Sequence, residues 1–322
     1  MTVSAVIPTW NRRGLLESIL EDLRAQTLPP SEVIVVDNGS TDGSAEAAEN
    51  AGASVIRLGT NKGFSYAVNR GIAASAGEWV AILNNDVRLG PDWIERLLPT
   101  ADSECWFVSG KLMRAGGSGI LDGSFDLLCR GACAWRAGNN RPDGPAWNTP
   151  RKVFFVPFTA AIFRRTLFGR IGLLDEEFES YLEDVEFGLR CALAGCSGVY
   201  QPAAVAHHLG SATLGSWNPE TVRRVSRNQM LIVAKHYPRD WVRRYGWEVL
   251  VGQLLWGALA VRHGAGWAWI RGKREGIGRI RTTRRKDDAR LRAILAACEA
   301  DIRAMQEATG YDLFWRLYFA LT

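Results

Sequence analysis

Short apolar segments alternate with amphipathic segments of helical length over the first hundred residues. Apolar runs occur at VSAVI, EVIVVD, SVIRL and EWVAIL, and one intervening segment carries Leu15, Ile19, Leu20 and Leu23 at helical spacing. Strands that are apolar on both faces are typical of a parallel sheet covered by helices on both sides. The pattern therefore predicts an α/β fold with a doubly wound, mainly parallel sheet.

The pattern changes twice further along the chain. Residues 101–160 have weak periodicity, and NNRPDGPAWNTP within them is rich in loop-forming residues. Order returns with an apolar strand at KVFFVPF, and a helix is predicted to begin close to Glu183. Beyond about Ser216 the pattern is helical throughout and ends in an amphipathic stripe from Leu291 to Met305. We expect three segments, 1–100, 101–215 and 216–322, the last a helical extension of the sheet.

Charge and apolar residues are unevenly distributed in the last segment. The net charge is +5, yet residues 262–286 alone carry nine Lys or Arg against one Glu. The apolar run Val249–Val261 beside them is shorter than the roughly 20 residues that span a bilayer, so it packs as core or lies in a membrane interface. Trp267 and Trp269 among the cations would suit stacking on nucleic-acid bases or contact with anionic lipid. We favour contact with an anionic membrane and expect no nucleic-acid partner.

The N-terminus and the cysteines bear on the compartment. MTVSAVIPTW lacks the basic start and long apolar run of a secretory signal, so we expect a cytoplasmic protein, peripheral on the inner face of the cell membrane if its basic segment binds lipid. The six cysteines form no CxxC pair. We expect buried free thiols rather than a zinc site or disulfides.

Polar residues follow three of the predicted strands, at Pro8 to Asn11, Asp37 to Asp42 and Asn84 to Asp86. The carboxyl ends of parallel strands meet at one edge of a sheet, where ligands bind, so these residues should converge. Asp37 could accept a hydrogen bond from a base, and Asp86 could reach a cation bound to a diphosphate. Taken singly, each segment is more often an ordinary helix cap or a turn.

Several ordered motifs point to a known family: AVIPTWNR, VIVVDNGSTDGS, NKGFSYAVNRGI, LNNDV, LDEEFESYLEDVEFGLR, VAHHLGSAT and SRN. Over roughly residues 2–235 the chain resembles glycosyltransferase family 2, which has the GT-A fold, and within it the bacterial rhamnosyltransferase-like group. The resemblance implies that residues 1–100 bind a nucleotide sugar and that 101–215 hold the acceptor and the catalytic group. Residues 216–322 would then form a basic, membrane-associating extension.

The resemblance also assigns the site residues. It implies a nucleotide site formed by Pro8, Thr9, Asn11, Asp37, Asn38, Gly39, Lys62, Asn85 and Arg227. Asp86 matches the last position of the family's metal-binding DxD motif, which reads NND here and lacks the first carboxylate. His207 matches a later metal ligand, because Ser211 falls where the group has a small polar residue; His208 is the adjacent alternative. The metal would be Mn²⁺ or Mg²⁺, and a histidine ligand favours Mn²⁺.

Glu183 and Asp184 match the family's ED motif, and Asp184 takes the role of catalytic base. Inverting transfer needs one carboxylate to remove the proton of the acceptor hydroxyl as its oxygen attacks the sugar. A purely structural alternative is that Glu183, Asp184 and Glu186 favour the start of a helix.

The resemblance implies an inverting, metal-dependent transfer of a sugar from a nucleotide diphosphate to a hydroxyl of a glycan or polyprenyl-linked acceptor. dTDP-rhamnose is the expected donor, with a UDP-sugar as the alternative. VPFTAAIFRR departs from the group, which has a glycine where this chain has Phe158 and Thr159, so donor specificity cannot be copied. A non-catalytic nucleic-acid or membrane-binding protein is a further alternative. A nucleotidyltransferase ranks last, since no GxxxxGK loop is present.

Overall fold

The computed structural model describes residues 1–98, 104–209, 217–280 and 289–322. The chain divides into two compact units, the first comprising Met1–Phe125 and Gly138–Gly210 and the second comprising Asp126–Ala137 and Ser211–Thr322. The end of the first unit lies close to the predicted boundary at residue 215. Asp126–Ala137, which falls within the predicted 101–215 segment, belongs to the second unit.

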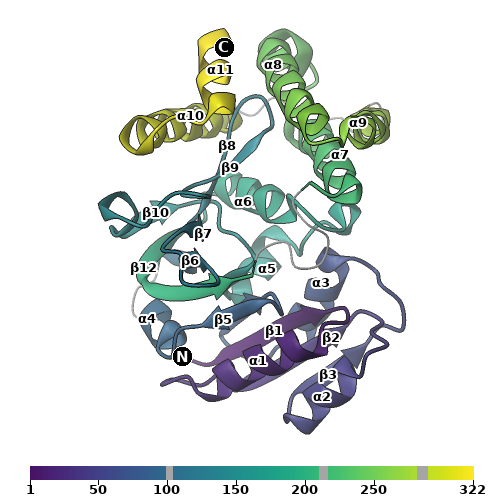
Figure 1. Cartoon of the computed structure of the whole chain (residues 1–322), viewed down its shortest axis with the longest axis vertical. Coiled ribbons are helices and arrows are strands. Elements are labelled where there is room, and N and C mark those ends of the chain that lie inside the picture. Colours follow the sequence, from purple (N-terminus) through teal and green to yellow (C-terminus); the bar gives the residue numbers. More distant parts are fainter. Residues whose placement is uncertain (99–103, 210–216, 281–288) are drawn as a thin grey trace. The chain divides into compact units, whose positions relative to one another are not determined.

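The first unit consists of a sheet and the helices that cover it (Figure 1). In chain order its elements are β1 (Val3–Thr9), α1 (Arg13–Arg24), β2 (Glu32–Asp37), α2 (Ser44–Asn50), β3 (Ser54–Arg57), α3 (Phe64–Ala74), β4 (Trp79–Leu83), β5 (Val87–Leu89), α4 (Trp93–Leu97), β6 (Cys105–Arg114), β7 (Leu121–Gly123), the short 3-10 helix Pro145–Trp147, β10 (Arg151–Val153), β11 (Ala160–Arg164), α5 (Arg165–Ile171), the 3-10 helix Glu176–Phe178, α6 (Glu183–Leu193) and β12 (Ser197–His208).

The strand order is β10-β12-β6-β11-β4-β1-β2-β3, with β5 paired to β12 and β7 paired to β6. Strands β4, β1, β2 and β3 are parallel to one another, as the apolar runs predict. Strand β11 runs antiparallel to both of its neighbours, β4 and β6, so the complete sheet is mixed. The predicted α/β fold with a C-terminal helical extension is confirmed.

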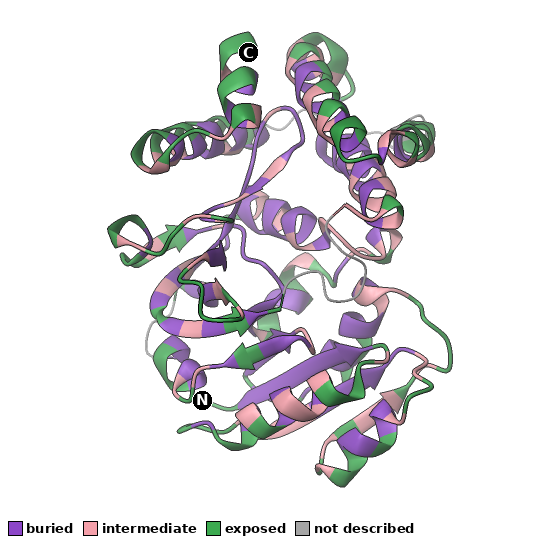
Figure 2. Ribbon diagram, viewed as in Figure 1, coloured by how far each residue is buried: buried purple, intermediate pink, exposed green. Residues whose placement is uncertain are grey.

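Helices cover both faces of the parallel strands. Alternate residues of β1 face opposite sides, and Ala5 and Ile7 are buried in a core that also contains Leu16 and Ile19 of α1. On the other face α3 lies so close that a Cβ added to Gly71 would come within 2.2 Å of a Val6 methyl. Figure 2 shows β1 buried along its length, and β2 is buried from Ile34 to Asp37. The carboxyl ends of these strands are therefore where polar groups can meet a ligand.

A buried lysine fixes the loop-rich segment that follows β7. The side chain of Lys111 on β6 is 4% exposed, and its Nζ lies 2.8 Å from each carboxylate oxygen of Asp143. The Tyr200 hydroxyl donates to the Trp147 carbonyl at 2.9 Å, and burial raises the pKa of Tyr200 to about 12. Since an unpaired buried charge is costly, the Lys111 pair holds this loop in one position.

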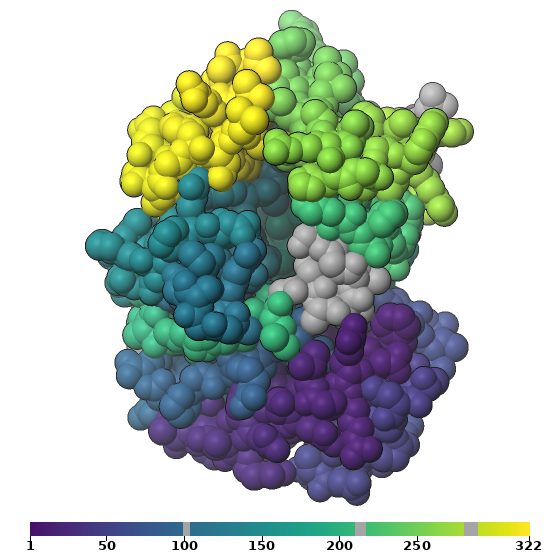
Figure 3. Space-filling view, in the orientation of Figure 1, coloured from purple at the N-terminus to yellow at the C-terminus, as the bar shows by residue number. Residues whose placement is uncertain are grey.

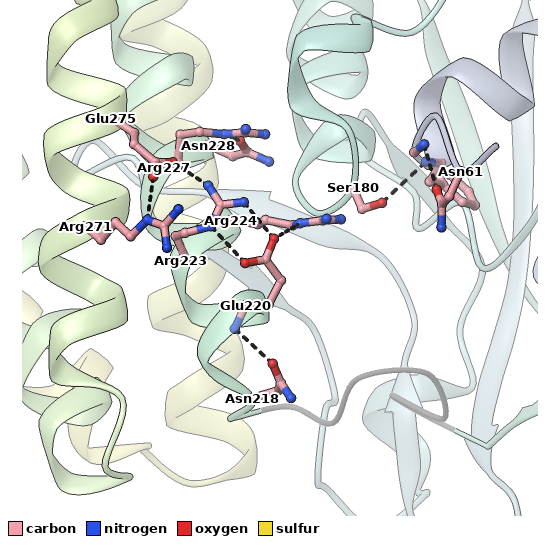
Figure 4. Close-up of polar contacts among 12 residues, drawn as sticks. Asn61, Ser180, Asn218, Glu220, Arg223, Arg224, Arg227, Asn228, Arg271 and Glu275 are labelled. Carbon is pink, nitrogen blue, oxygen red and sulfur yellow. Dashed lines mark hydrogen bonds and ion pairs between the residues drawn. The ribbon is translucent and has the colours of Figure 1, made fainter. Parts of the chain in front are cut away.

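As far as the structure describes it, the second unit is helical apart from one short hairpin. Its described elements are β8 (Asp126–Leu128), β9 (Ala134–Arg136), α7 (Pro219–His236), α8 (Trp241–Arg262), α9 (Gly266–Ile280), α10 (Ala289–Thr309) and α11 (Leu313–Leu321). Helices α7 and α9 pack closely, since a Cβ added to Gly272 would lie 2.2 Å from the Arg223 carbonyl oxygen. Figure 3 shows the side chains of α9, in light green, as a continuous surface. Arg223 also pairs with Glu220 and Glu275 (Figure 4).

The hairpin turn is bound by three helices of its own unit. The Arg130 guanidinium lies 2.6 Å from carboxylate oxygens of both Glu248 on α8 and Glu299 on α10. The backbone N–H of Gly131 donates to the hydroxyl of Tyr318 on α11 at 3.0 Å. These contacts explain why Asp126–Ala137 belongs with the helices although its neighbours in sequence belong to the sheet.

The two segments singled out for membrane contact are divided between core and surface. In the apolar run, Val249 and Ala260 are buried, while Leu250 and Val261 are exposed. In the basic segment, Lys273 is buried, so not every cation of the segment is available to a membrane surface; residues 281–286 lie outside the described part. Over the described ranges, none of the helices combines the length and the hydropathy needed to cross a bilayer. All six cysteines are buried and free, as predicted.

Candidate active site

The ends of β1 and β4 are linked by side-chain hydrogen bonds. The Asn85 amide donates to the Thr9 hydroxyl at 2.9 Å, and Thr9 donates to the Asn11 carbonyl. The backbone N–H of Asn11 in turn donates to the Ser40 hydroxyl at 2.8 Å, and the Asn11 side chain accepts from Thr41 N–H. Asn11 adopts a left-handed conformation with φ 58, which aims its amide oxygen at the turn after β2. The predicted convergence of these strand ends is present.

Asp37 and Gly39 shape the turn at the end of β2. One carboxylate oxygen of Asp37 accepts the Ser40 N–H at 3.0 Å, and the side chain is 5% exposed. Gly39 has φ +84, and a Cβ added there would lie 2.8 Å from Thr60 Cα. Only glycine allows both this backbone conformation and this approach. The turn therefore has a fixed shape beside the predicted base pocket.

Asn38 organises the next loop. Its amide nitrogen donates to Asn61 Oδ1 and to the Gly63 carbonyl, each at 3.1 Å, and its oxygen accepts the Lys62 N–H at 2.7 Å. The side chain is 5% exposed. Asn38 thus holds the Asn61–Gly63 loop, and the exposed Lys62 side chain extends from that loop.

The segment before α6 docks on the first turn of α3. Ser65 N–H donates to the Glu179 carbonyl at 2.9 Å, and Phe64 N–H donates to the Ser180 hydroxyl at 3.4 Å (Figure 4). Three residues of this segment have positive φ: Glu179 (57), Tyr181 (73) and Leu182 (64). Non-glycine residues adopt this conformation at an energetic cost, and such strain is concentrated at functional sites. The strained segment leads directly into the two carboxylates of the ED motif.

Helix α6 begins at Glu183, where the sequence predicts, and its carboxylates differ in environment. Glu183 and Glu186 are buried, and Glu186 forms an ion pair with Arg190 at 3.0 Å. Asp184 is half-buried, and its Oδ1 accepts the N–H of Val185 at 2.8 Å. It lies beside aromatic side chains that line the same small hollow, including Phe154 and Phe187. Asp184 is therefore the more accessible member of the predicted pair.

A second cluster, at the end of β12, consists of Asp86, Asp122 and His208. Strand β12 pairs with β5 so that His208 lies opposite Val87, next to Asp86. The His208 Nε2 lies 3.2 Å from Asp86 Oδ1, and its Nδ1 lies 2.8 Å from Asp122 Oδ2. His207 is exposed, because neighbouring residues of a strand face opposite sides. Of the two candidate histidines, His208 is the one that the structure brings to Asp86.

The two carboxylates determine the charge of His208. Burial by itself lowers the pKa of this imidazole, but hydrogen bonds to Asp122 and Asp86 outweigh burial and raise it to about 9. At neutral pH the ring therefore carries a proton on both nitrogens and donates to both carboxylates. A metal ion would have to displace the proton on Nε2, whereas the hydrogen bond from Nδ1 to Asp122 could remain and orient the ring.

The cluster fits a divalent cation with few protein ligands. Two adjacent ligand atoms of an octahedral ion lie about 3 Å apart, which matches the 3.2 Å between His208 Nε2 and Asp86 Oδ1. Over the described ranges of the chain, no three His, Cys, Asp or Glu side chains are arranged to hold a metal. Such an ion would thus take its remaining oxygen ligands from a diphosphate and from water, as Mg²⁺ and similar ions commonly do.

Pro8 and Arg227 are the remaining residues of the predicted nucleotide site. Pro8 precedes Thr9 in β1 and pairs with Val36. Arg227 lies on α7 of the second unit, where its Nε donates to Asn228 at 2.9 Å (Figure 4). Ser211, which set the register of the histidine motif, lies outside the described residues.

Sequence reasoning missed two contributors to the site. Asp122 is 86 positions from its partner His208 and lies in a stretch without periodicity, so no local signal marks it. Glu179 contributes a backbone carbonyl, which the side-chain sequence does not encode.

Comparisons with known proteins indicate the family of this chain. The family model described as "Glycosyl transferase family 2" matches residues 4–172. The N-acetylglucosaminyl-diphospho-decaprenol L-rhamnosyltransferase of Mycobacterium tuberculosis is 35% identical over 243 residues, which cover 65% of this chain and 76% of the relative. A PGL/p-HBAD biosynthesis glycosyltransferase of Mycobacterium bovis is 29% identical over 195 residues, covering 58% of this chain and 68% of that protein.

Two solved structures share the fold. A mannosyltransferase from Pyrobaculum calidifontis, in complex with GDP-Man and Mn²⁺, aligns with a TM-score of 0.54 and 16% identity over 99% of this chain and 86% of its own. GalNAc-T7 with UDP, GalNAc and Mn²⁺ aligns with a TM-score of 0.62 and 16% identity over 97% of this chain and 58% of its own. At this identity the likeness concerns the fold.

Proposed function

Because this chain belongs to glycosyl transferase family 2, and is therefore a glycosyltransferase, we propose that it catalyses an inverting transfer in which Asp184 is the base. The observation that carries this proposal is the position of Asp184, half-buried at the start of α6 behind a strained segment that docks on α3. An accessible carboxylate on a rigid helix can receive the acceptor proton while the acceptor oxygen attacks the sugar. Buried Glu183 supports the helix start rather than the proton transfer.

We further propose that Asp86 and His208 hold a divalent cation, Mn²⁺ or Mg²⁺. Such an ion would supply charge stabilisation for the departing diphosphate. Asp122 would position the His208 ring through its hydrogen bond to Nδ1. This arrangement assigns the histidine ligand to His208 in place of its neighbour His207. It also fits the NND triplet, since the ion then depends on one aspartate and one histidine.

Donor and acceptor are proposed from the relatives. The name of the Mycobacterium tuberculosis relative specifies L-rhamnose and a diphospho-decaprenol acceptor. By analogy we propose L-rhamnose from dTDP-rhamnose as the transferred sugar and a polyprenyl-linked glycan hydroxyl as the acceptor. A UDP-sugar is the alternative donor, because Asp37 and Asn11 would bind either pyrimidine base. A lipid-linked acceptor would require the protein to work peripherally at the inner face of the cell membrane.

The proposal is tested by measuring nucleoside diphosphate release from a panel of donors with Mn²⁺, with Mg²⁺ or with EDTA. The full chain is compared with Asp184→Asn, and kcat of the variant should fall by about 10²–10⁴-fold while donor affinity is kept. Asp175→Asn is the matched control. The Asp175 side chain accepts a hydrogen bond from Glu177 N–H in the segment that precedes α6, and an asparagine side chain can still accept that bond. Full transfer activity in Asp184→Asn would overturn the assignment of the base.

The same panel identifies the donor. dTDP-rhamnose should give the highest kcat/KM, and preference for a UDP-sugar would select the alternative. A protein that releases no nucleoside diphosphate from any donor but binds vesicles would be a membrane-binding protein without transferase activity. EDTA should abolish release if Asp86 and His208 hold the required ion.

A further inference from the structure

The exposed face of α8 is apolar over most of the length of the helix. Between Arg243 and Arg262, every exposed side chain is apolar: Trp247, Leu250, Leu254, Ala258 and Val261. These positions are three or four residues apart, so they form one stripe about 20 Å long. A helix at the surface of a globular protein normally carries polar and charged residues on its outer face. The α8 stripe needs a covering partner.

Helix α11 extends this apolar surface. Its residues Leu313, Leu317 and Leu321 are 60%, 40% and 52% exposed and recur at every fourth position. The two helices are joined where the indole N–H of Trp247 donates to the Leu321 carbonyl at 2.7 Å. At the other end of the stripe, Val261 contacts Gly266, the residue before Trp267, which is 84% exposed. We call the exposed residues Trp247, Leu250, Leu254, Val261, Leu313, Leu317 and Leu321 the apolar face.

The exposed charges on α8, α9 and α11 have one sign. The exposed charged residues of α8, α9 and α11, as far as the structure describes them, are all arginines: Arg243, Arg262, Arg271, Arg274, Arg279 and Arg316. The two acidic residues in these helices are less exposed and already form ion pairs, Glu248 with Arg130 and Glu275 with Arg223 and Arg271. An apolar face on helices whose exposed charges are all positive is complementary to a surface that is apolar inside and anionic outside.

We propose that the apolar face lies in the interface of an anionic phospholipid bilayer, with the flanking arginines at the headgroups. This inference rests on the proposed function in one respect: a lipid-linked acceptor would give the protein a reason to bind a membrane. The binding surface is α8 and α11 rather than the basic segment 262–286 alone. Trp, Leu and Arg are the residues that interfacial helices use, and each arginine near an anionic surface adds attraction that salt screens. A second copy of the chain fits less well, because like charges would then approach one another.

Flotation of the full chain with vesicles tests the proposal. Vesicles of phosphatidylcholine alone are compared with vesicles that also contain phosphatidylglycerol, at low and high salt. The wild type should float with the anionic vesicles, and Leu250→Gln/Leu254→Gln should lower the partition coefficient by about ten-fold or more. Arg262→Gln/Arg274→Gln should weaken binding mainly at low salt. Leu28→Gln/Leu173→Gln, which changes two exposed leucines of the first unit, is the matched control and should bind like the wild type.

The outcomes separate this inference from the catalytic proposal. Asp184→Asn should float like the wild type, because vesicle binding needs no chemistry, and the leucine variant should still release nucleoside diphosphate with a water-soluble acceptor. Circular dichroism verifies that the variants are folded. If Leu250→Gln/Leu254→Gln is unfolded, the single variant Leu254→Gln is used in its place. The proposal is overturned if the wild-type protein does not bind anionic vesicles. It is also overturned if the leucine variant binds them as well as the wild type does. Wild-type dimers that become monomers in the leucine variant, without vesicle binding, would assign the face to a second copy.

Discussion

At the scale of single residues, the site depends on which of two neighbouring histidines faces Asp86. His207 and His208 have the same chemistry and differ only in the side of β12 on which they lie. The structure brings His208 within 3.2 Å of Asp86 and leaves His207 exposed. Adjacent residues thus have different expected roles, and each is the natural control for the other.

We expect His208→Ala to raise the Mn²⁺ concentration needed for half-maximal activity by about 10–100-fold or more, because one of two protein ligands is lost. His207→Ala should leave this concentration within about two-fold of the wild type, since its side chain lies away from the cluster. Activity measured over a range of Mn²⁺ concentrations distinguishes the two variants. The register assignment is wrong if His207→Ala is the variant that loses metal activation, and equal metal response in both would make the His208 contacts purely structural.

At the scale of elements, turn geometry rather than side-chain chemistry forms part of the nucleotide site. Gly39 follows β2, and its φ of +84 and its contact with Thr60 leave no room for a Cβ. Asn38 and the Asn61–Gly63 loop are held together by three hydrogen bonds. The loop after β2 is therefore bonded directly to the loop after β3.

Gly39→Ala should weaken binding of the nucleoside diphosphate by about ten-fold or more, because the added methyl pushes the turn against the Thr60 backbone and misplaces it. Gly52→Ala is the matched control: its φ is +83, but nothing lies within 4 Å of an added Cβ. Both variants have the same backbone strain, so the difference in calorimetric affinity isolates the contact with Thr60. Equal losses in the two variants would attribute the effect to strain alone.

At the scale of the whole molecule, stability depends on a buried lysine, Lys273 of α9, whose side-chain nitrogen contacts neutral oxygen atoms. The Lys273 ammonium lies 3.0 Å from the Ser226 carbonyl and also contacts Gln229 and Gln253. Burial lowers its pKa from 10.5 to about 7. The unfolded chain therefore binds more protons than the folded chain between these two pH values, so the free energy of unfolding rises with pH across that window.

We expect the Lys273 contribution to fall as pH drops from 10.5 to about 7, with a slope of about 1 kcal/mol per pH unit. Lys273→Met should remove this slope, which is read from the difference between wild-type and variant urea unfolding curves at several pH values. Lys152→Met, in which an exposed lysine of β10 is lost, is the control for removing a positive charge. A difference curve that is flat in the same window would mean that the folded protein keeps Lys273 charged.

Local sequence determined the elements of this protein and the composition of its site. Apolar runs of strand length and stripes of helical spacing depend only on neighbouring residues, and they predicted the parallel strands β1–β4, the start of α6 at Glu183 and the C-terminal helices. The polar residues after β1, β2 and β4 were expected to meet because parallel strands end at one edge, and hydrogen bonds from Asn85 to Thr9 and from Asn11 to Ser40 connect them.

Only the tertiary structure decided which residues from distant parts of the sequence meet, because this depends on how the strands pair. Alternation along β12 indicates that His207 and His208 face opposite sides, but not which of them faces Asp86. That depends on the pairing with β5 and on the irregularity between Gln201 and Val205 in the pairing with β6, since a shift of one residue exchanges the two faces. Asp122 reaches His208 across 86 positions because β7 and β12 both pair with β6. The apolar face of α8 likewise became visible only when packing had buried the other half of Val249–Val261.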